Sequence, residues 1–350
     1  MIEQLITNYG EGAVLMAAGA LVGVFFGAMA QHSRFCLRAA TVELAERKIG
    51  PRIAIWLIAF SAAVSSVQFA IALDWLDVSQ SRQLAAAGSM SGAVIGGLMC
   101  GIGMILARGC ASRLLVLSAT GNLRAMVTGL VLTIVAQMSL RGVLSPLRES
   151  LATLWLVPGG TARSILDSFN IGSGLAAIIA AVFLVGSLWL AHVRGVKLGH
   201  SVTAMGVGAA IALGWIATYM ISQNSFEVVA ISSVTFTGPS TDTLMGLVNS
   251  TRIPLGFGVG LVPGVFVGSA VMAIASGDFQ LQRFGPDSPM EQYLFGAALM
   301  GFGSMLAGGC AVGAGMSGGA IFALTAWVAV AAMWAGAMAT HILLNRPSRA

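Results

Sequence analysis

Three cysteines interrupt long apolar stretches and are the residues best suited to chemistry. They are Cys36, Cys110 and Cys310, whereas Cys100 lies inside an apolar stretch and is expected to be a small packing residue. A thiol is a weak hydrogen-bond donor and a soft contact for other sulfur atoms. No Cys-x-x-Cys pair or zinc-like spacing occurs, so we expect neither a metal nor a cofactor. Thiols along one path would suit an anion that contains sulfur, because weak contacts also release it.

Arginines flank two of these cysteines on both sides. A single Arg at the end of a membrane helix commonly extends to the interface. Four arginines beside two thiols instead favour a route for an anion. Three inert, buried thiols remain the alternative interpretation of the spacing. The four arginines are Arg34, Arg38, Arg108 and Arg113.

Glycines surround the other cysteine-containing breaks, at Gly109, Gly308 and Gly309. Glycine lets the backbone turn tightly and come close to a ligand. A helix that starts at such a break would present N–H groups, which favour anions. Close packing between helices is the alternative reason for these glycines.

The composition places these residues in a membrane. Of 350 residues, 57% are hydrophobic and 9% are charged, whereas soluble domains carry about 25% charged residues. The apolar runs are continuous and roughly 20 residues long, which favours helices over a β-barrel. The predicted fold class is an all-α polytopic membrane protein in contact with lipid. The net charge of +5 fits basic loops beside a membrane and gives no reason to expect a nucleic-acid partner.

About nine transmembrane helices are predicted, with short broken or re-entrant helices at the cysteines. Residues 141–170 should include an interfacial helix, and residues 223–254 should form a long loop. The basic residues predict an outside N-terminus and a cytoplasmic C-terminus, although Arg141, Arg148 and Arg163 fall on the wrong side. The expected spans are about 12–30, 51–73, 88–107, 123–140, 174–193, 201–221, 255–275, a stretch ending at Cys310, and 320–344.

An internal duplication organises the chain. Residues 96–111 read GGLMCGIGMILARGCA and residues 296–311 read GAALMGFGSMLAGGCA, at a constant offset (310 − 110 = 200). A weaker similarity links residues 22–27 to residues 263–268. The two Gly-Cys breaks would approach from opposite faces, as in an inverted repeat with a site at the interface. We expect one transport domain, 1–350, with pseudo-repeat halves at about 12–140 and 255–345. Two glycine-rich helices that are alike only in composition are the alternative.

The cysteine segments resemble those of the YeeE/YedE family of bacterial sulfur-compound transporters. The segments read GVFFGAMAQHSRFCLRAA, GIGMILARGCAS and GAALMGFGSMLAGGCAVGAGMSGG. The resemblance implies a multi-pass protein of the bacterial inner membrane that passes thiosulfate along Cys36, Cys110 and Cys310. It also implies a small cytoplasmic sulfurtransferase-like partner. Ala111 and Ala311 stand where the family commonly has Thr or Ser, which leaves the identity of the sulfur anion open.

Together, the residues and the resemblance predict a permease rather than an enzyme. Its substrate would be a small sulfur-containing oxyanion, with thiosulfate as the first candidate. A transporter of another sulfur or selenium species is one alternative. A membrane thiol oxidoreductase or sulfurtransferase that uses the same cysteines is another. A passive channel for other anions is a third, and it would not depend on the thiols.

Overall fold

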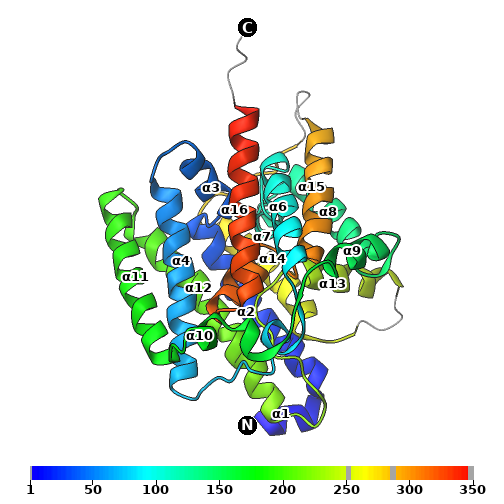
Figure 1. The fold of residues 1–350 in the computed structure, drawn as a ribbon. Helices are drawn as coiled ribbons and strands as arrows, with labels where there is room; N and C mark the ends of the chain where they lie inside the picture. The colour runs from blue at the N-terminus through cyan, green and yellow to red at the C-terminus, as the bar shows by residue number, and fades with distance from the viewer. Residues whose placement is uncertain (1, 250–253, 284–288, 346–350) are drawn as a thin grey trace.

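The structure, a computed structural model, describes residues 2–249, 254–283 and 289–345, which are almost entirely helical (Figure 1). Nine helices within these ranges are long and apolar enough to cross a membrane. The predicted all-α polytopic membrane fold is therefore confirmed. The ranges of these helices follow the predicted spans closely because long apolar runs are the strongest signal in such a sequence.

Three of the spans are interrupted, and each consists of a long helix followed by a short one. The short helices begin directly after Cys36, Cys110 and Cys310. The last of them, η2, is a π-helix. The interrupted spans are α2 (Glu11–Ser33) with α3 (Leu37–Ala45), α6 (Met90–Leu106) with α7 (Ala111–Ala119), and α15 (Met290–Leu306) with η2 (Ala311–Gly318). The other spans are α4 (Pro51–Ala72), α8 (Leu123–Arg141), α11 (Ser173–Val193), α12 (Leu198–Gln223), α14 (Phe257–Ala275) and α16 (Leu324–Leu344).

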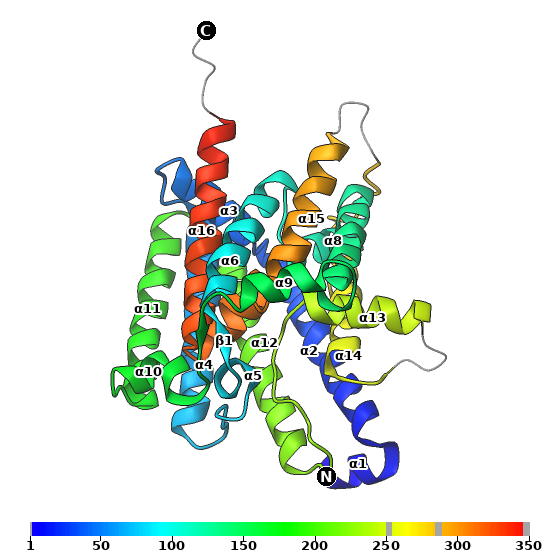
Figure 2. The same cartoon turned by 45° about the vertical axis from the view of Figure 1, so that its right-hand side comes forward.

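Short elements fill the connections between the spans. Residues 141–170, where an interfacial helix is expected, contain α9, which has no buried residue and lies across the bundle in Figure 2. Its place at the membrane interface stays a prediction. The two short strands pair antiparallel, with Gly88 opposite Val157. The short elements are α1 (Ile2–Tyr9), α5 (Arg82–Ala85), β1 (Gly88–Ser89), α9 (Ser145–Ala152), β2 (Leu156–Val157), the 3-10 helix η1 (Gly160–Arg163), α10 (Ile165–Ser168) and α13 (Thr237–Asn249).

The expectation of a plain loop over residues 223–254 is wrong. This connection contains α13, which projects sideways from the bundle in Figure 2. The segment Thr237-Gly238-Pro239 starts the helix, and Pro is well tolerated in a first turn because its missing N–H has no helical partner there. Residues 250–253 of the same connection lie outside the described residues.

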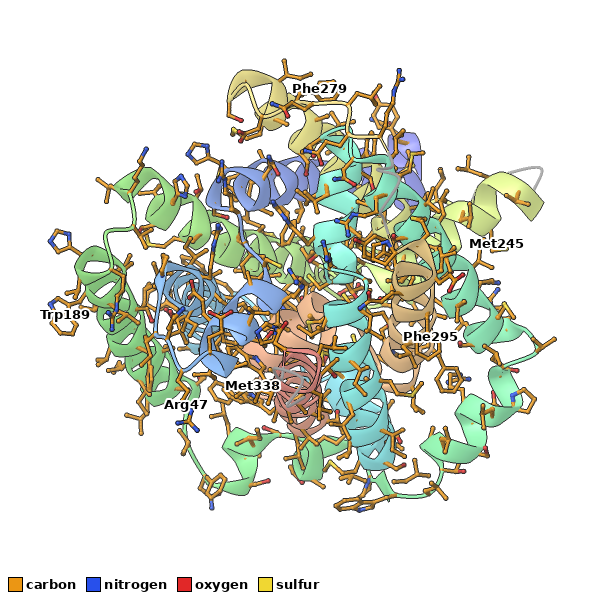
Figure 3. The ribbon with its side chains drawn as sticks, turned by 90° about the horizontal axis from the view of Figure 1, so that it is seen from above. Arg47, Trp189, Met245, Phe279, Phe295 and Met338 are labelled. Atoms are coloured by element: carbon orange, nitrogen blue, oxygen red, sulfur yellow. The ribbon has the colours of Figure 1, made fainter. Side chains whose placement is uncertain are left out.

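The two ends of the bundle differ in the elements that they carry. One end, called here the N-terminal face, carries α1 and α10, and the other, called the C-terminal face, is where α16 ends (Figure 1). Seen from the C-terminal face in Figure 3, Trp189 on α11 points away from the bundle, and its side chain is 69% exposed. Apolar exposure on the outer helices is what contact with lipid requires.

Glycines bring the main helices into backbone contact. A Cβ atom added at Gly23 would overlap the carbonyl of Leu261, and one added at Gly264 would overlap the carbonyl of Ala20. The contacts advance along both helices in the same direction, so α2 and α14 are parallel. Small residues at such an interface allow the close packing that associates helices in lipid.

The interrupted helices α6 and α15 form the matching antiparallel pair. Gly96 faces the carbonyl of Gly303, and Gly303 faces the carbonyl of Gly96. Gly103 and Gly296 face each other in the same reciprocal way. These four glycines are the equivalent positions of the 200-residue offset, so the two similar segments pack directly against each other.

Candidate functional site

Each of the three cysteines is the residue immediately before a short helix. Cys36 precedes α3, Cys110 precedes α7 and Cys310 precedes η2, and all three have extended backbone. A helix start leaves its first N–H groups without partners inside the helix. These groups carry partial positive charge and favour anions. The thiols therefore lie where the protein backbone itself attracts negative charge.

The turn before each cysteine has the same backbone geometry. Two residues upstream, the backbone is left-handed, with φ of 55° at Arg34, 54° at Arg108 and 79° at Gly308. Glycine adopts this conformation freely, whereas a side chain there costs roughly 1–2 kcal/mol. The chain thus turns in the same way at all three breaks, with strain at the first two.

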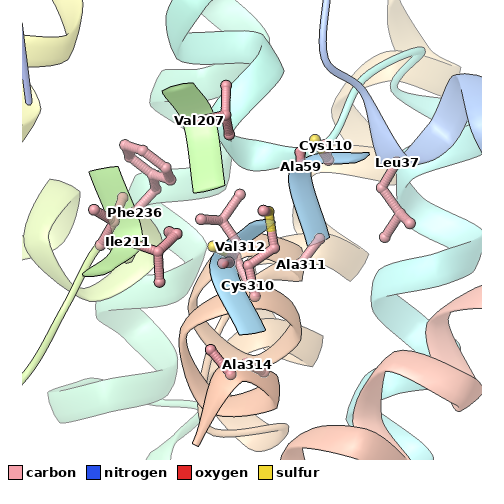
Figure 4. Packing of buried hydrophobic residues seen from close by; sticks show 14 of the residues in the cluster. Leu37, Ala59, Cys110, Val207, Ile211, Phe236, Cys310, Ala311, Val312 and Ala314 are labelled. Carbon is pink, nitrogen blue, oxygen red and sulfur yellow. The ribbon is translucent and has the colours of Figure 1, made fainter. Parts of the chain in front are cut away.

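The four thiols form two pairs, and the two members of each pair are neighbours. Cys36 lies beside Cys110, and Cys100 lies in the vicinity of Cys310. Cys110 and Cys310 are each 2% exposed and belong to one buried cluster, part of which Figure 4 shows. Cys36 is half-buried.

Two of the thiols have polar neighbours on their own short helix. The Cys110 sulfur lies 3.3 Å from the Ser112 hydroxyl, and the Gly313 N–H donates to the Cys310 sulfur over 3.5 Å. Ser112 is a site residue that sequence reasoning missed, although its position two residues after a cysteine was visible. Across the described ranges, no group of three or more His, Cys, Asp or Glu side chains could hold a metal ion.

Arg38 and Arg113 lie closest to the paired thiols. Both guanidinium groups are within charge–charge range of Cys36 and Cys110. Arg113 also lies 3.5 Å from the amide oxygen of Gln31. The Nε atom of Arg38 is buried and makes no hydrogen bond with any described residue. A buried cation with an unused donor is costly unless an anion or water completes it.

The other two predicted arginines lie farther out. Arg34 is half exposed and pairs with Asp278 at 3.7 Å, an arrangement that contributes little energy at a surface. Arg108 is exposed, and its guanidinium carbon lies 5.7 Å from the ring centre of Tyr293. Arg124, which the sequence did not single out, lies 4.8 Å from the same ring. These residues form a cationic rim rather than the centre of the site.

The predicted glycines have separate roles in the structure. Gly308 adopts a positive φ, and a Cβ atom there would meet no neighbour within 4 Å. Gly309 packs against the start of η2, where an added Cβ would lie 2.8 Å from the Ala314 nitrogen. Gly109 packs against Leu114, the corresponding position in α7. Gly308 and Gly309 also line a cavity.

This cavity has a volume of about 470 Å³ and reaches the residues directly before Cys310. Its lining includes Arg82 and Gln83 of α5, which lies toward the N-terminal face (Figure 2). We call it the outer cavity. Its charged and polar lining comes from connections far apart in the sequence, so spacing alone did not reveal it. The polar residues that matter below are Arg82, Gln83, Arg148, Arg163, Thr235, Asp242 and Thr325.

Two arginines of the outer cavity are fixed by hydrogen bonds to the protein. Arg163 donates to the Ala86 carbonyl over 2.7 Å and to the Thr325 hydroxyl over 2.6 Å. Burial lowers the pKa of Arg163 from its ordinary value. Arg148 donates through Nε to the Ser139 carbonyl over 2.8 Å. The sequence placed Arg148 and Arg163 in connections that the charge rule assigns to the outside, where basic residues are unusual. This exception was the sequence signal that could have identified them as candidates.

Asp242 contributes the carboxylate of the outer cavity. Burial raises the pKa of Asp242, and Arg141 partly opposes that shift. None of the ion pairs among the described residues joins Asp242 to Arg82, Arg148 or Arg163. Arg148 pairs instead with Glu149 at 3.1 Å, so Arg82 and Arg163 are the cavity cations without an ion pair among the described residues.

The chain is similar to known transport proteins along nearly all of its length. The profile of a family described as sulphur transport matches residues 32–339. The chain is 27% identical to the thiosulfate transporter TsuA of Escherichia coli K12, over 96% of both chains. It is 26% identical to the thiosulfate transporter TsuA of Spirochaeta thermophila, over 89% of this chain and 93% of that one. The family resemblance seen in the cysteine segments is thereby confirmed, and this protein belongs to the sulphur transport family.

Proposed function

We propose that this protein is a permease that takes up a small sulfur-containing oxyanion, thiosulfate first, along Cys36, Cys110 and Cys310. The observation that carries the proposal is that each of the three thiols immediately precedes a short helix that interrupts a span. Thiosulfate has a soft terminal sulfur and a doubly charged oxyanion body. A thiol can contact the sulfur while helix N–H groups and arginines stabilise the charge. The names of the two similar transporters support the same substrate.

Weak contacts suit this path better than strong ones. A substrate held by several full ion pairs would bind tightly and leave slowly, whereas conduction needs binding sites that also release. The buried thiols offer only weak S–H···S contacts. Arg38, with its unused Nε, and Arg113 would supply positive potential without enclosing the anion. Arg34 and Arg108 would add charge at the rim.

The direction of uptake follows from the distribution of charge. Arg47, Lys48, Arg194 and Lys197 lie in connections near the C-terminal face, which the charge rule assigns to the cytoplasm. The outer cavity would then open toward the outside and collect the anion. The location would be the cytoplasmic membrane of a bacterium. A small sulfurtransferase-like protein at the C-terminal face would receive the substrate.

The halves at about 12–140 and 255–345 would be an inverted repeat within the single domain 1–350. The reciprocal contacts of Gly96 with Gly303 support this relation for α6 and α15. The two cysteine-containing half-helices, α7 and η2, would then approach the membrane centre from opposite faces. α2 and α14 lie within these halves but pack in parallel, so the weaker similarity between residues 22–27 and 263–268 is not part of an inverted repeat. The inverted relation would hold for α6 to α8 and α15 to α16.

A competition experiment tests the substrate. Purified protein in liposomes should take up labelled thiosulfate, with unlabelled thiosulfate abolishing the signal and sulfate weakening it little. Equal competition by sulfate would contradict a path selective for soft sulfur, and stronger competition by selenite would favour a selenium substrate. Mass spectrometry of the protein after exposure to thiosulfate separates transport from enzyme chemistry. A stable persulfide or a Cys–Cys bond would favour the oxidoreductase or sulfurtransferase alternative.

A further inference from the structure

The helical stretch that begins with η2 covers residues 311–320 and is one residue longer than its counterpart α7, residues 111–119. Gly101 and Gly301 both lie nine residues before their cysteine (110 − 101 = 9 and 310 − 301 = 9). Gly101 faces the Met333 carbonyl, and Gly301 faces the Leu132 carbonyl. Leu132 lies 22 residues after Cys110 (132 − 110), whereas Met333 lies 23 residues after Cys310 (333 − 310). The additional residue falls in the segment where the structure has a π-helix, whose wider turn accommodates it.

Side chains of other elements bond to the carbonyls of this segment. Trp215 on α12 donates to the Ser317 carbonyl over 3.3 Å. Gln68 on α4 donates to the Ala320 carbonyl, just past η2, over 2.7 Å. Gln83 on α5 donates to the Gly313 carbonyl over 3.2 Å. Since π-helices are rare and poorly stabilised by their own bonds, these three donors help to hold the form that η2 adopts.

Gln83 differs from the other two donors because it also lines the outer cavity. It is bonded to Gly313, the residue whose own N–H donates to the Cys310 sulfur. Gly313 is also packed closely against Thr235, because an added Cβ would overlap the Thr235 hydroxyl. Two successive hydrogen bonds at Gly313 thus connect Gln83 in the cavity to the Cys310 thiol.

We propose that Gln83 is a positioning residue for Cys310. Its amide holds the first turn of η2 so that the Cys310 thiol is directed to the end of the outer cavity at Gly308 and Gly309. The consequence for transport rests on the proposed uptake function, whereas the positioning itself does not. Gln83 needs no charge for this role, only an N–H or O–H donor directed at the Gly313 carbonyl.

Chemical labelling of Cys310 tests the positioning without relying on transport. The protein used retains Cys310 and has serine at the other three cysteine positions, and a small anionic methanethiosulfonate is added from the N-terminal face. Gln83→Leu, which keeps the size and loses the donor, should change the labelling rate by about fivefold or more, as expected for one lost hydrogen bond of about 1 kcal/mol. The matched control is Gln80→Leu in the same connection, where the side chain is exposed, and its rate should stay unchanged.

Gln83→Glu supplies a second variant in case the Leu protein folds poorly. A protonated carboxyl group can donate to the Gly313 carbonyl, and an ionised one cannot. The labelling rate of Gln83→Glu is compared at each pH with that of the protein that retains Gln83. The two rates should become equal as the pH falls below the pKa of the new carboxyl group. This series uses a small neutral methanethiosulfonate, because an ionised carboxyl group at this position would itself repel an anionic reagent. With the neutral reagent, no recovery at low pH would mean that the hydrogen bond to Gly313 does not position Cys310.

The outcomes separate this inference from the proposed function. If Gln83→Leu labels at the same rate as the Gln83 protein, or if Cys310 does not label at all from that face, the positioning role is overturned. If labelling changes as expected while the natural protein takes up no thiosulfate, the positioning stands and the uptake proposal fails. If Gln83→Leu reduces uptake without changing labelling, Gln83 acts in another way and the inference is rejected.

Discussion

At the scale of single residues, the proposed anion path combines thiols with arginines. The thiols lie at the starts of α3, α7 and η2, where backbone N–H groups favour negative charge, and those of Cys110 and Cys310 are buried. Arg38 and Arg113 lie beside the paired thiols Cys36 and Cys110. Full charges are thus kept near the site but not in a closed cage around it. An anion can then be attracted by the arginines and still leave the weak contacts with the thiols.

Asp242 leads to a prediction about pH at this scale. Its carboxyl group lines the outer cavity, where its ionised form repels a doubly charged anion and offsets Arg82, Arg148 and Arg163. Because its pKa is raised by burial, the neutral form persists to higher pH than for an ordinary Asp. The KM for thiosulfate should therefore fall as the outside pH is lowered from neutral toward the pKa of Asp242.

Asp242→Asn isolates this contribution. The variant should show a low KM, reduced about twofold to fivefold at neutral pH, and should lose most of the pH dependence. Uptake rates over a range of thiosulfate concentrations at two pH values provide the measurement. An unchanged pH profile in Asp242→Asn would assign the pH dependence to another group.

At the scale of elements, backbone contact between helices determines where the breaks lie. The α6 and α15 helices approach through reciprocal glycines, so the residues that follow them, up to Cys110 and Cys310, are held at defined heights. A helix pair that close cannot slide without separating its backbones. We therefore regard the α6–α15 contact as the rigid part and the short helices α7 and η2 as the parts that meet the substrate.

Replacing a contact glycine should destabilise the protein. In Gly303→Leu the side chain would enter a space where even a Cβ lies 2.7 Å from the Gly96 oxygen and 2.9 Å from the Cys100 nitrogen. Overpacking of this kind costs about 1–3 kcal/mol or more. Thermal unfolding in detergent should occur at a lower temperature than for the natural protein.

The control for that prediction is Gly186→Ala on α11, where a Cβ would meet no atom within 4 Å. Alanine also favours the helix over glycine by about 1 kcal/mol. Its unfolding temperature should equal or exceed that of the natural protein. Equal unfolding temperatures for Gly303→Leu and Gly186→Ala would mean that the α6–α15 contact is not tightly packed.

At the scale of the whole molecule, charge and topology point to one orientation in the membrane. The connections near the C-terminal face carry most of the basic residues, and the outer cavity carries two of the three exceptions, Arg148 and Arg163 but not Arg141. This interpretation makes these two exceptions part of the substrate path rather than errors of the charge rule. The positive charge of Arg148 and Arg163 at the entrance would then serve to attract the anion and would not reflect the orientation of the chain in the membrane.

Orientation can be tested with two introduced cysteines. Phe226→Cys lies in the connection after α12, where the natural side chain is 94% exposed, and Leu198→Cys lies at the start of α12, where it is 79% exposed. A membrane-impermeant maleimide added to intact cells should label the protein with Phe226→Cys but not that with Leu198→Cys. After permeabilisation both should label, and the reverse pattern in intact cells would invert the proposed direction of uptake.

The sequence was sufficient for the spans and breaks and insufficient for the outer cavity. Long apolar runs and the Gly-Cys segments determine local structure, so α6, α15 and their interruptions could be predicted. The cavity combines Arg82, Arg163 and Asp242 from three connections, and only the packing of distant helices brings them together. The same reason applies to Gln83 and Gly313, which are 230 residues apart. The π-helix was not predicted because its extra residue is visible only once α7 and η2 are compared in space.

The uptake of labelled thiosulfate by Cys310→Ala in liposomes tests the central claim most directly. Cys310→Ala and Cys110→Ala should each abolish uptake although the protein is still made and folded, because each removes one soft contact along the path. Cys100→Ala is the matched control, since Cys100 lies inside α6 and the equivalent residue of α15 is Met300; it should retain uptake. Uptake by Cys310→Ala at the rate of the natural protein would contradict the account.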